Sequence, residues 1–413
     1  MKILVIDSGI GLQHAIRMKE EGHDVYYYIP WQSPYPKFQR YIIGEGFVDK
    51  VEDPFQVFEK VDFVVFTDSG FPDMADYMRR YKPVFGGGSI EELENDRFLL
   101  KRFLGRIGLK TSNYKVIKGI QSLLDYAKKH FESSDRTLYI KISKFRGDLE
   151  TFGADNYDYL ESSLYYLGKV VGPFSDEIVF VVEEELDGEF VEIGIDTFFD
   201  GNDFYRLKTF GLEVKTHTVV KFVENSVYDD VLNKLKIVFH DLGYRGPFSM
   251  EALYDGENLY ITDFTCRYPY PISMMFPLYI KNYTDFIYSI AQGKPVDMEI
   301  EGEMDDYYGT TNVYIDYDVH DRWLKLDWEE KDDIKVAVRS AVKKNDIIYN
   351  VPVEGESLVL TLLYKNKDIK ILFKTLSDYY NNFIKIPTVD IKGDFSDVFD
   401  KDIRILRSFG IDF

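Results

Sequence analysis

Short apolar runs separated by amphipathic stretches organise the first 88 residues. Runs typical of buried strands lie at 2–7, 24–29, 62–67 and 83–85, and helical periodicity fills the segment between the first two. Buried strands that alternate with helices are typical of a parallel sheet covered by helices. The pattern therefore predicts a Rossmann-like domain over residues 1–88.

The turn after the first strand carries two of the three glycines of a dinucleotide-binding fingerprint, in Asp7-Ser8-Gly9-Ile10-Gly11. Such a turn often serves only to pack a strand against a helix. No acidic residue ends the second strand, where a ribose contact would be expected. We therefore interpret the turn as a packing feature or a substrate-phosphate contact, ahead of NAD binding.

Three glycines, Gly86-Gly87-Gly88, interrupt the chain before a helical pattern. Ser89 and Glu92 have the spacing of a capping box, and the pattern continues to about Gly105. A strand is predicted at 138–142, with Leu138, Ile140 and Ile142 on one side and Lys141 on the other. Lysine is unusual in a short apolar strand, which favours a functional role for Lys141.

The segment 243–267 has the pattern of a β-hairpin. Alternating arms at 248–253 and 259–265 flank Asp255-Gly256, a strong turn signal. The pattern places Glu251 and Asp263 opposite each other to within one residue, and Mg²⁺ could relieve the repulsion of two carboxylates so close together. Alternatively, Glu251 lies on a solvated face and Asp263 is an ordinary strand-end residue.

The last part of the chain, from about residue 295, alternates acidic stretches with predicted strands at 312–315, 357–363 and 369–373. This pattern predicts a small α+β domain over 295–413, and we find no catalytic constellation in it. The chain as a whole is thus expected to be a multidomain α/β and α+β protein.

Composition excludes several classes of protein. The 413 residues carry a formal charge of −21, which argues against nucleic acid or an anionic membrane surface as a partner. A single cysteine, Cys266, excludes an intrachain disulfide and suits a reducing compartment. Six scattered histidines argue against a zinc site built from histidine, and no apolar run approaches a membrane span. We expect a cytoplasmic protein, as a monomer or homodimer.

The segments GYRGPFSMEAL and LYITDFTCR resemble the metal-binding hairpin of the ATP-grasp ligases. The resemblance implies ATP as a bound nucleotide and Mg²⁺ as its metal, with Mn²⁺ as an alternative. It implies Glu251 and Asp263 as metal ligands, with Thr265 at a ligand position where the family has Asn. It also implies that Arg267 contacts phosphate or an acyl-phosphate intermediate.

Other segments match the same family in the same order. The resemblance implies that Arg97 and Lys141 contact the nucleotide phosphates, and that Lys144 and Arg146 belong to a phosphate-covering loop with unusually few glycines. Arg97 as a surface helix residue, and 144–146 as a solvated basic turn, are the alternatives. The run VFVVEEELDGE resembles the family's hinge. It implies that the Glu183 side chain and the main chain of Glu184 and Leu186 bind adenine.

In the same hinge, the family match implies that Glu189 binds the ribose hydroxyls, or Glu192 if the strand register differs. Without the resemblance, the acidic residues 183–185 are interpreted as a charged surface. The stretch 206–221 concentrates basic residues in an acidic chain. This stretch, with Lys215 as a candidate catalytic residue, could bind an anionic substrate, or it could be a plain basic surface strand.

The N-terminal segment, MKILVIDSGIGLQHAIRMK, is most similar to the phosphoribosylamine–glycine ligase branch of the family. This implies an ATP-grasp fold with a pre-ATP-grasp domain at 1–88, a connecting helix within 89–111, a lid at 112–185, a core at 186–294 and a cap at 295–413. It implies an ADP-forming ligase of purine biosynthesis that joins a small-molecule carboxylate to an amine through an acyl phosphate. A ligase with another acceptor, such as a modified nucleotide, and a catalytically weak nucleotide-binding homologue are the alternatives.

Overall fold

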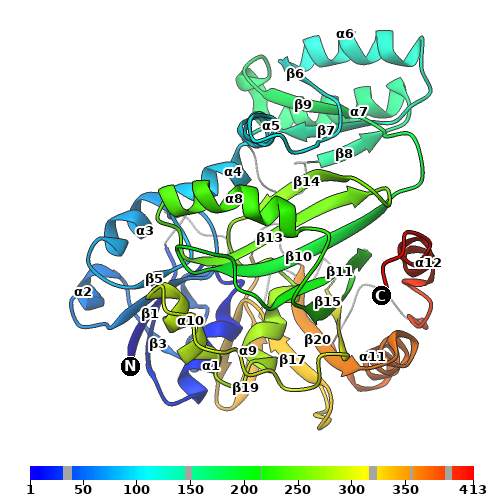
Figure 1. Cartoon of the computed structure of the whole chain (residues 1–413). Helices are drawn as coiled ribbons and strands as arrows, with labels where there is room; N and C mark the ends of the chain where they lie inside the picture. The colour runs from blue at the N-terminus through cyan, green and yellow to red at the C-terminus, as the bar shows by residue number, and fades with distance from the viewer. Residues whose placement is uncertain (31–39, 145–150, 215, 316–322, 354–356, 387–392) are drawn as a thin grey trace. The chain divides into compact units, whose positions relative to one another are not determined.

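The computed structural model describes residues 1–30, 40–144, 151–214, 216–315, 323–353, 357–386 and 393–413 (Figure 1). The chain forms two compact units. Unit 1 contains Met1–Glu91, Glu192–Met250 and Thr265–Phe413, and unit 2 contains Glu92–Val191 and Glu251–Phe264. Within the described ranges, no helix combines the length and the apolar character that crossing a membrane requires.

A five-stranded parallel sheet forms the N-terminal part of unit 1, as the sequence predicts. Its order is β3-β2-β1-β4-β5, and its buried strands lie close to the predicted runs. The strands are β1 (Lys2–Ile6), β2 (Asp24–Tyr28), β3 (Asp49–Lys50), β4 (Phe63–Phe66) and β5 (Val84–Phe85), and the helices are α1 (Leu12–Glu20), α2 (Phe55–Phe58) and α3 (Pro72–Arg79). The two-residue strand β3 is too short to leave a pattern.

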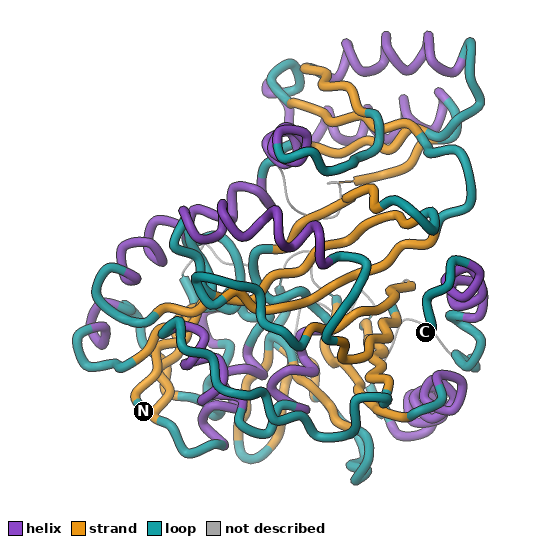
Figure 2. Tube along the Cα trace, viewed as in Figure 1, coloured by secondary structure: helices purple, strands orange, loops and turns teal. Residues whose placement is uncertain are grey.

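A larger, eight-stranded sheet has the order β14-β13-β10-β11-β12-β15-β20-β17 (Figure 2). The pairs β10–β11, β11–β12, β12–β15, β15–β20 and β17–β20 are antiparallel. The strands are β10 (Val191–Phe199), β11 (Lys208–Val214), β12 (His217–Val223), β13 (Gly246–Tyr254), β14 (Leu259–Thr265), β15 (Tyr307–Tyr314), β17 (Lys335–Val338) and β20 (Leu358–Asn366).

Among its described residues, the rest of unit 1 consists of a small sheet, β16-β19-β18, and five helices. These elements are β16 (Leu324–Lys325), β18 (Ala341–Lys344), β19 (Ile347–Asn350), α8 (Asp229–Asp241), α9 (Met275–Tyr279), α10 (Tyr283–Ala291), α11 (Ile369–Phe383) and α12 (Asp400–Ser408). The predicted strand at 369–373 is wrong because this segment begins α11. The Asp368 side chain caps that helix, and buried Ile369, Leu372 and Leu376 have helical spacing.

A buried carboxyl group within the large sheet gives a testable pH dependence. Asp196 of β10 is 7% exposed and accepts a 2.7 Å hydrogen bond from Thr209. Burial raises its pKa from 3.8 to about 6. A carboxyl group whose pKa is raised by folding favours the folded state below its unfolded pKa, and this contribution is lost as the pH rises through the folded pKa.

Asp196→Asn should therefore unfold at a higher temperature than the wild type at pH 8, because it removes the cost of a buried charge. The gain is at most about 3 kcal/mol, and it should vanish near pH 4. Thermal unfolding at the two pH values measures it, with the exposed Asp203→Asn as a control. A variant that is less stable at pH 8 would contradict the raised pKa.

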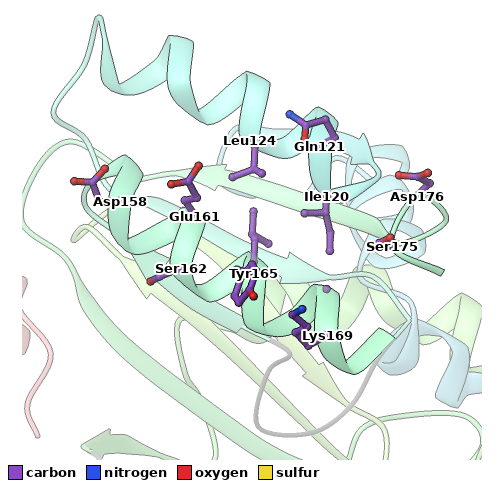
Figure 3. A pocket seen from close by; sticks show the side chains of 12 residues that line it. Ile120, Gln121, Leu124, Asp158, Glu161, Ser162, Tyr165, Lys169, Ser175 and Asp176 are labelled. Atoms are coloured by element: carbon purple, nitrogen blue, oxygen red, sulfur yellow. The ribbon is translucent and has the colours of Figure 1, made fainter. Parts of the chain in front are cut away.

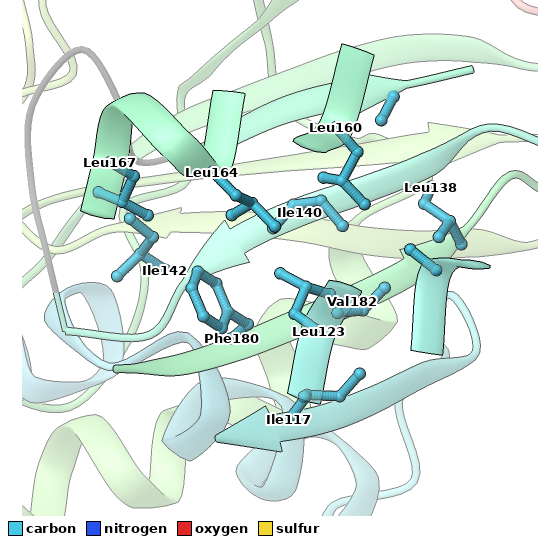
Figure 4. Close-up of a cluster of buried hydrophobic side chains, with 12 residues drawn as sticks. Ile117, Leu123, Leu138, Ile140, Ile142, Leu160, Leu164, Leu167, Phe180 and Val182 are labelled. Carbon is cyan, nitrogen blue, oxygen red and sulfur yellow. The ribbon is translucent and has the colours of Figure 1, made fainter. Parts of the chain in front are cut away.

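Unit 2 is built on a four-stranded sheet of order β6-β9-β7-β8. Its elements are β6 (Tyr114–Lys118), β7 (Leu138–Ile142), β8 (Thr151–Ala154), β9 (Val179–Glu184), α4 (Glu92–Asn95), α5 (Arg97–Arg106), α6 (Ile120–Phe131) and α7 (Tyr157–Val171). Helices α6 and α7 supply Leu123 and Leu164 to a core shared with Leu138, Ile140 and Phe180 of the strands (Figure 4). The apolar face of β7 packs against this core, and Lys141 lies on the opposite face of the strand.

The predicted helix from Ser89 to Gly105 is divided. A 3₁₀ turn at Ser89–Glu91 and the short α4 precede α5, which begins after Asp96. The Asp96 carboxylate accepts a hydrogen bond from the Leu99 amide and caps α5. The predicted capping box is wrong, because the Ser89 hydroxyl donates to Asp76 instead.

The hairpin prediction is confirmed in its boundaries. Strands β13 and β14 begin and end within two residues of the predicted arms, and the Asp255 amide donates to the Asn258 carbonyl across the turn. Buried Ile261 and Phe264 lie three residues apart, which departs from the two-residue period of a regular strand. Cys266 is fully buried, as expected of a core residue.

Candidate functional site

Helix α5 of unit 2 presents two cations on its buried face. The buried residues Arg97, Leu100, Lys101 and Leu104 follow helical spacing i, i+3, i+4, i+7. The Arg97 guanidinium lies 2.5 Å from an Asp263 carboxylate oxygen on β14. One turn later, the Lys101 ammonium lies 3.1 Å from the Glu183 carboxylate on β9. The helix thus connects the hairpin to the sheet of unit 2 through charged groups.

Lys141 joins the same cluster from β7. Its ammonium lies 3.1 Å from the same Glu183 oxygen that contacts Lys101, and 3.3 Å from the Thr262 carbonyl oxygen. This position follows from the strand register, because Tyr139 pairs with Glu183 and Lys141 lies two residues further along the same face. The sequence prediction that Lys141 points away from the apolar face is confirmed.

Lys101 is the member of the cluster that the sequence analysis missed. It is 2% exposed, and its ammonium also lies 3.4 Å from both the Ser112 hydroxyl and the Ile261 carbonyl. These partners come from segments far apart in the sequence, so no local pattern marks them. A signal was nevertheless present, because Lys101 shares the apolar helix face of Leu100 and Leu104.

The cluster contains three cations and two carboxylates with defined contacts. Arg97, Lys101 and Lys141 face the carboxylates of Glu183 and Asp263. Burial lowers the pKa of Lys101 to about 8 despite the attraction of Glu183. Burial opposes ionisation of Glu183, but Lys141, Lys101 and a hydrogen bond from Ser112 lower its pKa below the ordinary value. Arginine and lysine side chains bind phosphate groups well, so these cations could serve an anionic ligand.

The charged state of Glu183 gives a stability prediction for unit 2. Glu183→Gln leaves two buried lysines without their counter-ion and should lower the free energy of unfolding by about 3 kcal/mol at pH 7. Because folding lowers the pKa of Glu183, its stabilising contribution is present above pH 4.5 and is lost as the pH falls through the folded pKa. Urea unfolding measures this, with the exposed Glu177→Gln as a control. A variant as stable as the wild type would contradict it.

The predicted metal ligands on the hairpin are accessible. Asp263 keeps a quarter of its side-chain surface exposed while it pairs with Arg97, and Glu251 is exposed on β13. In the described part of the chain, no group of three or more His, Cys, Asp and Glu residues could hold a metal ion by itself. Mg²⁺ is commonly held by one or two carboxylates together with substrate phosphates, and the two acids fit that mode.

The predicted phosphate-covering loop is described only at its start. Lys144 is largely exposed and lies 3.2 Å from Asp96, and Arg146 lies outside the described residues. At the end of β7, the Ser143 carbonyl accepts from the Arg97 amide and the Ser143 hydroxyl donates to Asp96. The end of β7 and the start of α5 are therefore held together, which fixes the position of Arg97.

The predicted hinge residues lie at and beyond the end of β9. The Glu184 amide donates to the Asn113 carbonyl, and its side chain accepts from Tyr126. Leu186 is partly buried and Glu189 is exposed. Glu192 lies in unit 1, on β10. The proposed adenine and ribose contacts of all these residues stay predictions.

The basic stretch 206–221 does not form one cationic patch among the residues described. Arg206 pairs with Asp297, and Lys208 donates to the Glu224 carbonyl. Lys221 donates to the Asp412 carbonyl, and burial lowers the pKa of His217 to about 4, so that its ring is neutral. These separate partners favour the interpretation as ordinary strand residues. Lys215 lies outside the described residues.

Arg267 and Thr265 belong to unit 1. The Arg267 Nε lies 3.2 Å from Asp68, which follows β4, and its Nη1 donates to the Tyr268 carbonyl. Thr265 ends β14 and is partly buried. Arg267 therefore lies beside the carboxyl end of the parallel sheet of unit 1.

The glycine turn after β1 binds a carboxylate of the protein itself. The Gly11 amide donates to both Asp7 oxygens, at 3.1 and 3.0 Å. A side chain at Gly11 would lie 2.5 Å from the Tyr270 hydroxyl and 2.6 Å from Thr67. The tight turn allows this close packing, which supports the interpretation of the glycines as a packing feature.

A groove of about 750 Å³ lies elsewhere in unit 2, between α6 and α7 (Figure 3). Its walls include Ile120, Leu124, Tyr165 and Lys169, and its rim includes Glu161. None of its lining residues belongs to the Arg97–Lys101–Lys141 cluster. We do not assign the groove to the chemistry of that cluster.

Comparisons with known proteins identify the fold of this chain. The sequence matches no protein-family model and no curated protein. Solved structures match over almost the whole chain. Phosphoribosylamine–glycine ligase of Thermotoga maritima aligns with a TM-score of 0.62 at 14% identity, over 94% of this chain and 99% of that one. The chain has the ATP-grasp fold.

Two further ATP-grasp structures align as well. The biotin carboxylase domain of Hydrogenobacter thermophilus 2-oxoglutarate carboxylase, solved with MgADP, ADP and bicarbonate, has a TM-score of 0.64 at 13% identity and covers 100% of this chain and 99% of its own. The N5-carboxyaminoimidazole synthetase of Staphylococcus aureus, solved with ADP, has a TM-score of 0.59 at 14% identity, over 92% and 96% of the two chains.

Proposed function

We propose that this protein is an ATP-dependent ligase that joins a small-molecule carboxylate to an amine and releases ADP and phosphate. The observation that carries the proposal is the cluster of Arg97, Lys101 and Lys141 around Glu183 and Asp263. Its arginine and lysine side chains are of the kind that binds nucleotide phosphates. The ATP-grasp fold, shared with structures solved with ADP, supports the same choice of ligand.

In the proposed reaction, a carboxylate oxygen of the first substrate attacks the γ-phosphorus of ATP, and ADP leaves. The amine then attacks the acyl carbon, and inorganic phosphate leaves with the original carboxylate oxygen. Bound Mg²⁺, held by Asp263 and Glu251, would neutralise phosphate charge. Arg97 and Lys141 would bind and orient the phosphates, which is how proteins usually promote phosphoryl transfer.

Lys101 has a supporting role in this proposal. It is 2% exposed, and it shares one Glu183 oxygen with Lys141. It thereby holds the carboxylate against which Lys141 is positioned. Preorganised charges of this kind stabilise developing charge without rearrangement during the reaction.

A direct experiment follows ADP release from MgATP in the presence of glycine and phosphoribosylamine, and then with each of the twenty amino acids as the carboxylate. Carboxylate-dependent ADP formation, with ¹⁸O transferred from the carboxylate to phosphate, is the expected result. If the protein bound ATP but formed no ADP with any of these substrates, it would be a nucleotide-binding protein without ligase activity. That result would overturn the ligase proposal.

A further inference from the structure

The register of the parallel sheet in unit 1 brings two side chains together at its carboxyl edge. Ile6 of β1 pairs with Phe66 of β4, so the chain places Ser8 beside Asp68 two residues later. The Ser8 hydroxyl donates to one Asp68 oxygen, and the Ser69 amide donates to the other at 2.9 Å. The sheet therefore fixes the orientation of the Asp68 carboxylate.

This edge lies at the topological switch point of the sheet. The order β3-β2-β1-β4-β5 places β2 on one side of β1 and β4 on the other, so the loops after β1 and β4 diverge. Open parallel sheets bind ligands beside such a point. The loop after β1 is already engaged, because Asp7 binds the Gly11 amide and accepts from Tyr27 and Thr67. Asp68, after β4, extends toward Arg267.

Asp68 constrains Arg267 through the guanidinium Nε. That atom lies 3.2 Å from Asp68 Oδ1, and Nη1 is held at 3.1 Å by the Tyr268 carbonyl. Contacts at two positions fix the plane of the guanidinium group, whose donors form a rigid fork. Both side chains keep some solvent exposure, at 19% for Arg267 and 14% for Asp68. The pair is thus oriented by the fold without being sealed off.

We propose that Asp68, itself held by Ser8, is a positioning residue that orients Arg267 for contact with phosphate or the acyl phosphate. This inference rests on the proposed ligase function and on the sequence prediction that Arg267 contacts phosphate. The Asp68–Arg267 contact itself does not depend on that function. Partly exposed ion pairs usually add little stability. If the Asp68–Arg267 pair had only a structural role, its loss should therefore change kcat little.

The kinetic test compares Asp68→Asn with the wild type, using MgATP and the carboxylate and amine that give the fastest ADP release. Loss of a group that orients a reacting side chain should lower kcat by about 10–100-fold, and the KM for ATP should change by less than about twofold. Ser8→Ala should lower kcat in the same direction by less. Asp68→Glu should recover part of the activity of Asp68→Asn.

A double-mutant cycle separates positioning from an independent effect. Arg267→Lys should lower kcat more than Asp68→Asn, and the double variant should be no slower than Arg267→Lys alone, because Asp68 acts through Arg267. Asp76→Asn is the matched control, since Asp76 pairs with Arg79 at 2.8 Å in the same unit and is also partly exposed. Its kcat should equal that of the wild type. Additive effects, or normal kcat in Asp68→Asn, would overturn the inference.

A measurement without substrate tests the contact even if no ADP is formed. In ¹⁵N-arginine-labelled protein, the Nε–H signal that disappears in Arg267→Lys belongs to Arg267. Asp68→Asn should cause loss of that signal through faster exchange with water, and Asp76→Asn should leave it unchanged. An unaltered signal in Asp68→Asn would refute the positioning role, whatever the fate of the ligase proposal.

Discussion

Lys141→Ala should abolish ADP formation while the protein stays folded. The Lys141 ammonium is held by Glu183 and the Thr262 carbonyl, and under the proposed function it contacts the nucleotide phosphates. Removing one preorganised donor to a reacting group typically costs about 100–1,000-fold in kcat. We therefore expect a loss of at least about 100-fold, measured as ADP release at saturating MgATP.

The fold should survive this change because Glu183 keeps two other partners. Lys101 remains 3.1 Å away, and the Ser112 hydroxyl continues to donate to the carboxylate. Lys118→Ala is the matched control, because Lys118 is a largely exposed lysine of the same sheet. Normal turnover in Lys141→Ala would contradict its assignment. Low turnover together with a lowered unfolding temperature would point to a structural role instead.

Asp263→Asn should lower ADP formation by a comparably large factor, because it weakens the binding of Mg²⁺. The substitution keeps the shape of the side chain and an acceptor for Arg97, but it removes the negative charge that Mg²⁺ requires. ADP formation should fall by at least about 100-fold at low Mg²⁺, because the metal supplies much of the charge neutralisation in phosphoryl transfer. Part of the loss should be recovered at high Mg²⁺.

Titration of ADP release with Mg²⁺ measures this prediction. The control is Glu257→Gln, a carboxylate exposed at the tip of the same hairpin, which should titrate like the wild type. If Asp263→Asn followed the wild-type Mg²⁺ curve, Asp263 would be only the partner of Arg97. An unchanged curve in Glu251→Gln would likewise remove Glu251 from the metal site.

The sequence predicted those parts of the molecule that local pattern determines. The parallel strands of the N-terminal sheet and the β13–β14 hairpin follow from apolar runs and an Asp-Gly turn, and both are present. The orientation of Lys141 follows from strand alternation. Where local signals compete, prediction was wrong: the apolar start of α11 resembled a strand, and Asp96 began a new helix inside a continuous helical pattern.

Contacts between distant segments could not be predicted in this way. Lys101 is buried because Glu183 and the Ile261 carbonyl approach it from β9 and β14, and α5 alone gives no sign of them. Asp68 reaches Arg267 across about half the chain. Conversely, Lys208 and Lys221 belong to one basic stretch of the sequence but bind different partners. The sequence alone therefore overestimated how closely these basic side chains gather in the folded protein.

The most direct test of the account is a crystal structure with a non-hydrolysable ATP analogue and Mg²⁺. The account predicts phosphate oxygens in contact with Arg97 and Lys141, and the metal ion between those phosphates and Asp263. A triphosphate bound away from this cluster, or a metal ion without Asp263 as a ligand, would contradict it.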